Sequence, residues 1–102
     1  MLARIVSRLL GHARPPLSLV LYSRPGCHLC EEMKAEIARA RPRTPYELSE
    51  VDIERDQDLL RRFERSIPVL EIAGRVAFKG RLTATELEAK LERRARERGA
   101  GP

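Results

Sequence analysis

The sequence predicts a small α/β fold in which helices lie on both faces of one sheet. An apolar, β-prone segment covers residues 17–23, a helical stripe of apolar side chains follows Cys27, and alternation typical of a strand resumes at residues 48–53. A strand, a helix and a second strand in this order form a right-handed crossover with parallel strands. The first half of the chain therefore requires a layered sheet.

The first three elements have clear local signals. Residues 17–23, LSLVLYS, are almost continuously apolar, which predicts a central strand covered on both faces. A helix is predicted over residues 27–40, and two prolines just beyond it end the helical pattern. The strand at 48–53 is predicted to be half-exposed at a sheet edge, with Val51 and Ile53 on one face.

The second half of the chain continues with a helix and a hairpin. A short amphipathic helix is predicted over residues 56–65, with Asp56 as its N-cap. Residues 69–72 and 76–78 are predicted to pair as an antiparallel hairpin, because Gly74 between them suits a tight turn.

A final helix closes the predicted domain. Thr83 and Glu86 have the spacing of a capping box, and the helical pattern that follows ends near Gly99. The chain is too short for two independent cores, so we predict one domain. We divide the 102 residues into an N-terminal extension, a domain and a disordered tail, at residues 1–16, 17–98 and 99–102.

The N-terminal extension has its own amphipathic pattern. Apolar side chains recur at helical spacing within residues 1–14, and Pro15-Pro16 stops any helix. We interpret this segment as an extension that packs on the domain or frays, and we expect no membrane contact. The alternatives are a basic helix that binds a membrane surface or a partner, and part of an Arg-rich transit peptide.

The charge composition excludes several classes of function. Charged residues make up 34% of the chain with a net charge of +5, but arginines alternate with glutamates as in solvated helix faces. No zinc finger, RNA-binding aromatic motif or phosphate loop accompanies the basic excess, so we predict no specific nucleic-acid binding. Only two cysteines are present and no apolar run could span a bilayer, which predicts a cytoplasmic protein.

The two cysteines, Cys27 and Cys30, carry the chemical prediction. They open a helix directly after a buried strand, where free N–H groups and the helix dipole stabilise a thiolate on the first sulfur. Arg24 adds fixed positive charge nearby, and His28 adds more when protonated. We predict that Cys27 attacks a disulfide and that Cys30, within the first turn, resolves the mixed disulfide.

Two other interpretations of the pair remain open from the residues alone. Both sulfurs could be buried and inert, because free cysteine is among the most buried residue types. Cys27, His28 and Cys30 could instead contribute to a metal site shared across a dimer, although one pair supplies too few ligands by itself. We therefore predict no bound metal within one chain. Ile67-Pro68, where a helix gives way to a strand, is expected to be trans on general frequencies.

Taken together, the segment from Tyr22 to Cys30, YSRPGCHLC, the later Ser66-Ile67-Pro68 and the order of elements resemble the glutaredoxin family and its glutaredoxin-like relatives in the thioredoxin superfamily. The resemblance covers residues 17–98. It implies a thioredoxin-like three-layer α/β/α sandwich. The implied sheet is four-stranded and mixed, in the order 2-1-3-4, with strand 3 antiparallel.

The resemblance also implies roles for single residues. Pro68 would be cis and face the cysteine pair, the backbone of Ile67 would pair with the substrate's cysteine, and Arg24 would help to bind glutathione. We take Arg24, His28, Ile67 and Pro68 as candidate substrate-binding residues. His28-Leu29 replaces the usual Pro-Tyr of the family, and residues 79–83 replace its Gly-Gly and following acids.

The predicted function is dithiol–disulfide exchange, with Cys27 and Cys30 as the catalytic residues. The predicted partners are a disulfide-containing protein or glutathione mixed disulfides. We expect a monomer with no bound cofactor and glutathione as a candidate reductant. The alternative is a noncatalytic metal-binding or partner-binding module of the same fold.

Overall fold

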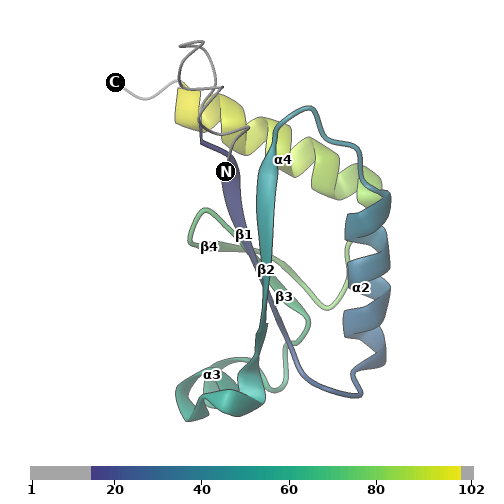
Figure 1. Cartoon of the computed structure of the whole chain (residues 1–102), viewed down its shortest axis with the longest axis vertical. Helices are drawn as coiled ribbons and strands as arrows, with labels where there is room; N and C mark the ends of the chain where they lie inside the picture. Colours follow the sequence, from purple (N-terminus) through teal and green to yellow (C-terminus); the bar gives the residue numbers. More distant parts are fainter. Residues whose placement is uncertain (1–14, 100–102) are drawn as a thin grey trace, which may run out of the picture.

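The structure is a computed structural model that describes residues 15–99 (Figure 1). The predicted N-terminal helix at residues 1–14 lies outside the described residues, as do residues 100–102 of the predicted tail. Gly99, which we placed in that tail, is the last residue of a helix. In chain order the elements are β1 (Leu17–Ser23), α2 (His28–Arg39), β2 (Tyr46–Asp52), the 3-10 helix η1 (Ile53–Arg55), α3 (Gln57–Phe63), β3 (Val69–Ile72), β4 (Arg75–Lys79) and α4 (Ala84–Gly99).

The four strands form one mixed sheet in the order β2-β1-β3-β4, which confirms the predicted order. β1 and β2 run parallel, with Leu21 opposite Glu50. β3 runs antiparallel to β1, with Tyr22 opposite Val69, and β4 runs antiparallel to β3. The antiparallel pairing sets the end of β1 beside the start of β3.

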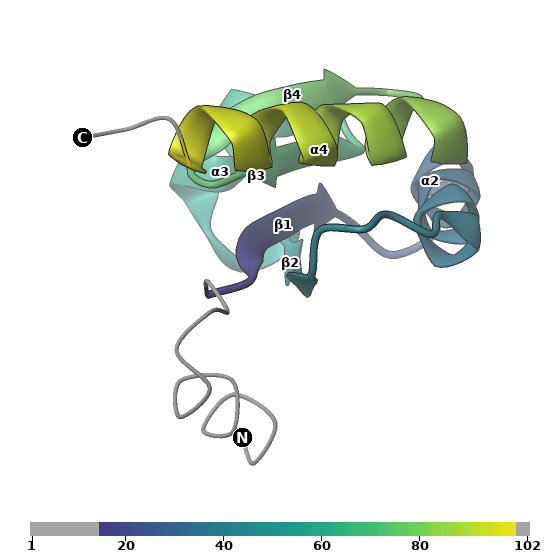
Figure 2. The ribbon, with the colours of Figure 1, turned by 90° about the horizontal axis from the view of Figure 1, so that it is seen from above.

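Two helices cover one face of the sheet (Figure 2). Alternate residues of β1 point to this face, where they pack with side chains of α2 and α4. The fully buried side chains here are aliphatic apart from Met33, as the low aromatic content predicts. This core cluster contains Leu17, Leu19, Leu21, Met33, Ile37, Ala40, Leu70, Ile72, Leu82, Leu87 and Leu91.

Within residues 15–99, the opposite face is covered only at one end, by α3. A second cluster joins Phe63 of α3 to Val69 and to Tyr22, whose ring stacks on Phe63 with 4.7 Å between centroids. Farther along β1, Val20 is half-exposed and Ser18 is exposed. The prediction that β1 is covered on both faces is therefore only partly right. The reason is length, since seven helical residues span about 10 Å, whereas seven strand residues span about 23 Å.

Local signals explain where the later elements begin. The Asp56 side chain accepts hydrogen bonds from the amides of Asp58 and Leu59, so the predicted N-cap of α3 is confirmed. Thr83 and Glu86 exchange the two hydrogen bonds of a capping box, as predicted. The strand predicted at 48–53 begins and ends earlier, at Tyr46 and Asp52, because the chain turns into η1 at the buried Ile53.

The hairpin turn uses two residues with positive φ. Ala73 has φ 51° and Gly74 has φ 82°, as the type I′ turn of a two-residue hairpin requires. The Ala73 amide also donates to the Ser18 carbonyl at 2.8 Å, which extends the pairing of β3 with β1. Gly74 was predicted to supply the turn, whereas the left-handed Ala73 was not predicted.

The two ends of the described chain meet at one pole of the molecule (Figure 1). The Arg98 guanidinium, in the last turn of α4, donates to the Pro15 carbonyl at 2.7 Å. β1 runs from this pole to the other, where it leads into the loop that carries Cys27. The cysteines and the two chain ends are thus separated by the length of β1.

Candidate active site at the start of α2

A tight turn delivers Cys27 to the start of α2. Pro25 and Gly26 occupy the two central positions, and Gly26 has φ 74°. This is the pattern of a type II turn, in which proline suits the first central position and glycine the second. The chain therefore leaves β1 and enters the helix within four residues, which fixes the sulfur of Cys27 beside the helix N-terminus.

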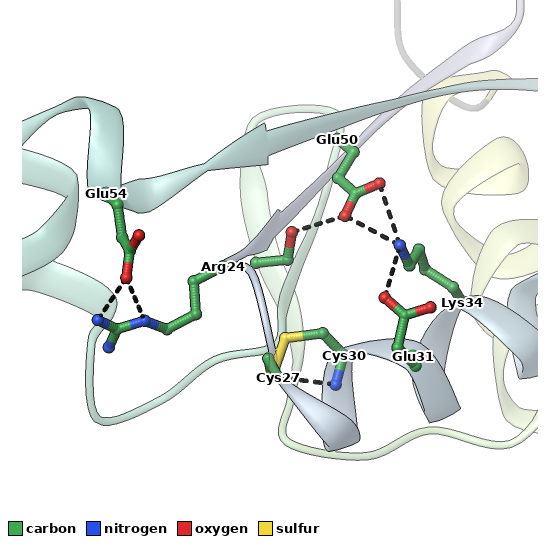
Figure 3. Close-up of a disulfide and its surroundings, with 8 residues drawn as sticks. Arg24, Cys27, Cys30, Glu31, Lys34, Glu50 and Glu54 are labelled. Carbon is green, nitrogen blue, oxygen red and sulfur yellow. Dashed lines mark hydrogen bonds and ion pairs between the residues drawn. A yellow bond between two sulfur atoms is a disulfide. The ribbon is translucent and has the colours of Figure 1, made fainter.

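The two cysteines form a disulfide, with 5.2 Å between their Cα atoms (Figure 3). Cys27 is the N-cap of α2, and its Sγ accepts a hydrogen bond from the Cys30 amide at 3.1 Å. Cys27 is half-buried, whereas Cys30 is only 1% exposed. The two sulfurs thus differ in access, so an incoming molecule would meet Cys27 first.

The geometry at Cys27 suits a thiolate. The Cys30 amide points at the Cys27 sulfur, and the positive end of a 12-residue helix lies behind that sulfur. Both features stabilise negative charge and lower the pKa of a cysteine at a helix N-terminus. The hypothesis of two inert thiols in the core is not compatible with the half-exposed Cys27.

Ile67-Pro68 is a cis peptide, as the family resemblance implied. The general frequencies of X-Pro bonds had predicted a trans peptide. Pro68 directly precedes β3, whose first residue pairs with Tyr22, so it lies at the same end of the sheet as the loop to Cys27. Its carbonyl accepts a hydrogen bond from the Gly80 amide at 2.7 Å. The Ile67 amide donates to the Phe63 carbonyl at 3.0 Å, so a substrate strand would have to use the Ile67 carbonyl.

Arg24 is already engaged by another side chain. Its guanidinium donates through Nε at 3.0 Å and Nη2 at 2.7 Å to one carboxylate oxygen of Glu54. Figure 3 shows this guanidinium directed away from the two sulfurs. The predicted role of Arg24 in substrate binding stays a prediction, but its charge is balanced locally by an acid that sequence reasoning did not connect with it.

His28 lies on the exposed side of the first turn of α2. Its Nε2 lies 2.6 Å from a carboxylate oxygen of Glu32, and its side chain is 86% exposed. His28 is therefore at the surface beside Cys27, where a substrate could reach it. Its predicted role in substrate binding stays a prediction.

The structure adds a polar network that the sequence did not reveal. The buried Ser23 hydroxyl donates to Glu50 at 2.7 Å, and the Lys34 ammonium lies 3.2 Å from Glu50 and 2.9 Å from Glu31 (Figure 3). The Ser23 hydrogen bond, and next Lys34, hold the pKa of Glu50 below its ordinary value. The contacts with Glu31 and then Glu50 raise the pKa of Lys34. The sequence signal that could have indicated this network was the alternation in β2 that places Glu50 and Asp52 on one face of the strand.

Two other possibilities for residues 15–99 are a metal site and a membrane-spanning helix. Within this range, no group of three or more His, Cys, Asp or Glu side chains is arranged to hold a metal ion. Over the same range, no helix has both the length and the apolar character needed to cross a membrane.

The fold and the disulfide together define a thioredoxin-fold protein with a Cys-x-x-C cysteine pair. Residues 18–92 match the family model of the glutaredoxin-like domain (DUF836). Because the match covers most of the chain, the protein belongs to this glutaredoxin-like family.

Two solved structures have the same fold. One is the X-ray structure of the structural genomics target XcR50 from X. campestris, which is 32% identical, with a TM-score of 0.64 over 74% of this chain and 96% of that one. The other is the solution NMR structure of protein Ne2328 from Nitrosomonas europaea, which is 29% identical, with a TM-score of 0.61 over 79% of this chain and 98% of that one. No curated protein matches the chain.

Proposed function

We propose that the protein is a thiol–disulfide oxidoreductase that exchanges an electron pair with disulfide substrates through Cys27 and Cys30. One observation supports this proposal most directly. Cys27, which is only partly buried, caps α2 with its sulfur and is bonded to the buried Cys30 in the first turn of the same helix. A structural disulfide would gain most by joining distant segments, which this pair does not do.

The reaction begins with the dithiol form. A free cysteine thiol is only about 3% ionised at pH 7, and the helix N-terminus increases that fraction for Cys27. The Cys27 thiolate attacks one sulfur of the substrate disulfide, the substrate S–S bond breaks, and the second substrate sulfur leaves as a thiolate that takes a proton from water. The product is a mixed disulfide between Cys27 and the substrate.

Cys30 completes the exchange. Its thiol loses a proton and attacks Cys27 Sγ, which releases the remaining substrate sulfur as a thiol and closes the Cys27–Cys30 disulfide. The substrate gains two electrons and two protons, and the protein loses them. An external thiol reductant must then reopen the disulfide. Glutathione remains our candidate for that role, and the cytoplasm, where such reductants are abundant, remains the predicted compartment.

The cis proline supplies an edge against which a substrate can be aligned. We propose that the Ile67 carbonyl, beside Pro68 at the sheet end, accepts a hydrogen bond from the substrate backbone. One bond of this kind would hold an extended peptide beside Cys27 without selecting its sequence. Protein disulfides and glutathione mixed disulfides both present the required backbone amides.

The test separates the roles of the two cysteines. With dithiothreitol as reductant and hydroxyethyl disulfide as substrate, Cys27→Ser should abolish turnover. Cys30→Ser, mixed with hydroxyethyl disulfide after dithiothreitol has been removed, should accumulate a mixed disulfide, detected by mass spectrometry as one added substrate thiol on Cys27. Full activity of Cys27→Ser, with circular dichroism unchanged from the parent protein, would refute the proposal.

A further inference from the structure

The cations on one side of the disulfide are neutralised by the protein's own acids. Arg24 is bound by Glu54, and Lys34 lies between Glu31 and Glu50 (Figure 3). The Glu31 side chain is 70% exposed, whereas that of Lys34 is 34% exposed, so solvent meets the carboxylate more than the ammonium. A substrate approaching from this side would therefore meet negative charge.

On the other side of α2, basic side chains are likewise paired with an acid of the protein. Glu32 is contacted by His28 at 2.6 Å and by Arg81 at 3.7 Å, so one acid balances the nearest basic groups of both α2 and the loop before α4. Glu32 follows Cys30 by two residues, and its partner His28 directly follows Cys27, so these contacts lie beside the cysteine pair.

At the N-terminus of α4, two backbone amides are already bound by carboxylates of the protein. The Thr83 amide donates to Glu86 at 2.9 Å, and the Ala84 amide donates to Glu36 at 2.9 Å. These are the backbone groups with which a helix N-terminus would otherwise bind a carboxylate or a phosphate. Their use by two side chains of the protein leaves this end of the helix acidic instead of anion-binding.

Two grooves lie along the sides of α2, the helix that begins at Cys27, and carboxylates outnumber cations among the residues that line each groove. The groove toward β2 is lined by Glu31, Glu50 and Asp52 against Arg24 and Lys34. The groove toward α4 is lined by Glu32, Glu36 and Glu86 against Arg81. This local excess contrasts with the net charge of +5 of the whole chain, which by itself would attract anions.

We propose that the site selects positively charged disulfides, such as a protein cysteine flanked by lysine or arginine, over anionic ones such as glutathione disulfide. The proposal rests on the function proposed above and adds the substrate class. The carboxylates of the grooves attract a substrate with positive charge beside its disulfide and repel a substrate with a carboxylate there. At 0.1 M salt this electrostatic effect acts within about 10 Å. Local charge and whole-chain charge thus predict opposite orders of reactivity, which makes the proposal testable.

The experiment uses the reduced full-length chain and three small disulfides that differ in charge. Cystamine is cationic, hydroxyethyl disulfide is neutral and dithiodipropionate is anionic. The rate at which each oxidises the protein is measured by stopped flow at pH 7 and divided by its rate with dithiothreitol. This division removes the intrinsic reactivity of each disulfide, which depends on the pKa of its leaving thiol.

We expect the normalised rate to fall from cystamine to hydroxyethyl disulfide to dithiodipropionate. The ratio of the first to the last should be about tenfold at low salt and should approach one at high salt, where charges are screened. Equal normalised rates, or a faster anionic disulfide, would overturn the proposal and leave the redox function intact. Failure of all three disulfides to oxidise the protein would instead refute the redox function.

A pair of charge-matched variants locates the effect. Glu32→Gln removes one carboxylate from the groove and should lower the cationic-to-anionic ratio by about threefold. Glu97→Gln removes the same charge in the last turn of α4, remote from the cysteines, and should leave the ratio unchanged. Equal ratios for Glu32→Gln and the parent protein would show that the groove acids do not select the substrate.

Discussion

At the scale of single residues, the site depends on acids brought from other elements. Arg24 lies close to Cys27 in sequence, which predicted that its charge would act on the sulfur. Glu54, 30 positions along the chain, takes that guanidinium instead. Glu54 belongs to η1, a single 3-10 turn between β2 and α3. Its position could not be predicted, because no sequence signal marked that turn.

Glu50 gives a prediction about acid stability. Its pKa in the folded protein is lowered from the ordinary 4.5, chiefly by the Ser23 hydrogen bond. The ionised carboxylate therefore stabilises the fold above about pH 4.5, and this stabilisation is lost as the pH falls through the lowered folded-state pKa. Because the Glu50 side chain is 43% exposed, we expect Glu50→Gln to cost at most about 1 kcal/mol at pH 7.

Urea unfolding at pH 7 and pH 3 checks this prediction. The difference between the parent and Glu50→Gln should shrink at pH 3. In a Ser23→Ala background the same substitution should cost less, because the donor that favours the carboxylate is absent. A difference that is equal at both pH values would contradict an electrostatic origin.

At the scale of elements, the β3–β4 turn combines a favourable residue with an unfavourable one. Ala73 adopts the left-handed conformation, which costs about 1–2 kcal/mol for an L-residue with a Cβ atom. Ala73→Gly should therefore raise the free energy of unfolding by about 0.5–1 kcal/mol after the greater entropy of glycine in the unfolded chain is counted.

The neighbouring glycine supplies the matched control. A Cβ atom at Gly74 would meet no atom within 4 Å, so Gly74→Ala tests backbone conformation without a steric clash. It should lower the free energy of unfolding by about 1 kcal/mol. Thermal and urea unfolding measure both variants, and a destabilised Ala73→Gly would show that the turn does not limit stability.

The N-cap of α3 gives a second prediction about the elements of the fold. Asp56 accepts hydrogen bonds from the amides of Asp58 at 2.8 Å and Leu59 at 3.1 Å. Asp56→Ala should destabilise the fold by about 1 kcal/mol, whereas Asp56→Asn, which keeps an acceptor, should cost only a few tenths. Because the Ile67 amide is hydrogen-bonded to the Phe63 carbonyl at the end of α3, Asp56→Ala should also slow disulfide exchange in the hydroxyethyl disulfide assay more than Asp56→Asn does.

At the scale of the whole molecule, the disulfide contributes little to the fold. It closes a loop of only four residues, from Cys27 to Cys30, for which the chain-entropy model gives about 2 kcal/mol. Neither cysteine belongs to the two core clusters that pack on the faces of the sheet. We therefore expect the reduced protein to stay folded and to unfold at a urea concentration only modestly below that of the oxidised protein.

Urea unfolding followed by circular dichroism, with and without dithiothreitol, measures this difference. Cys27→Ser, which cannot form the bond, should show no effect of the reductant. Unfolding of the chain on reduction alone would assign the disulfide a structural role and would weaken the case for a redox cycle.

The sequence was sufficient for much of the architecture and for the cysteine pair. The capping residues Asp56, Thr83 and Glu86 bond to groups two or three positions away in the sequence. The local sequence pattern was therefore enough to predict where α3 and α4 begin. The partial cover of β1 depends on how far α3 reaches across the sheet, which local pattern does not contain. The cis state of Ile67-Pro68 followed from family resemblance alone, because local sequence leaves both isomers open.

The contact between Arg98 and the Pro15 carbonyl has a practical consequence for anyone who wishes to attach the molecule to something else. A fluorescent label, a solid support or a fused domain joined near residue 15 or residue 99 would project from the pole opposite Cys27. Such a tether should leave Cys27 accessible, so the domain could be displayed on a surface or coupled to a partner without blocking the end that carries the cysteine pair.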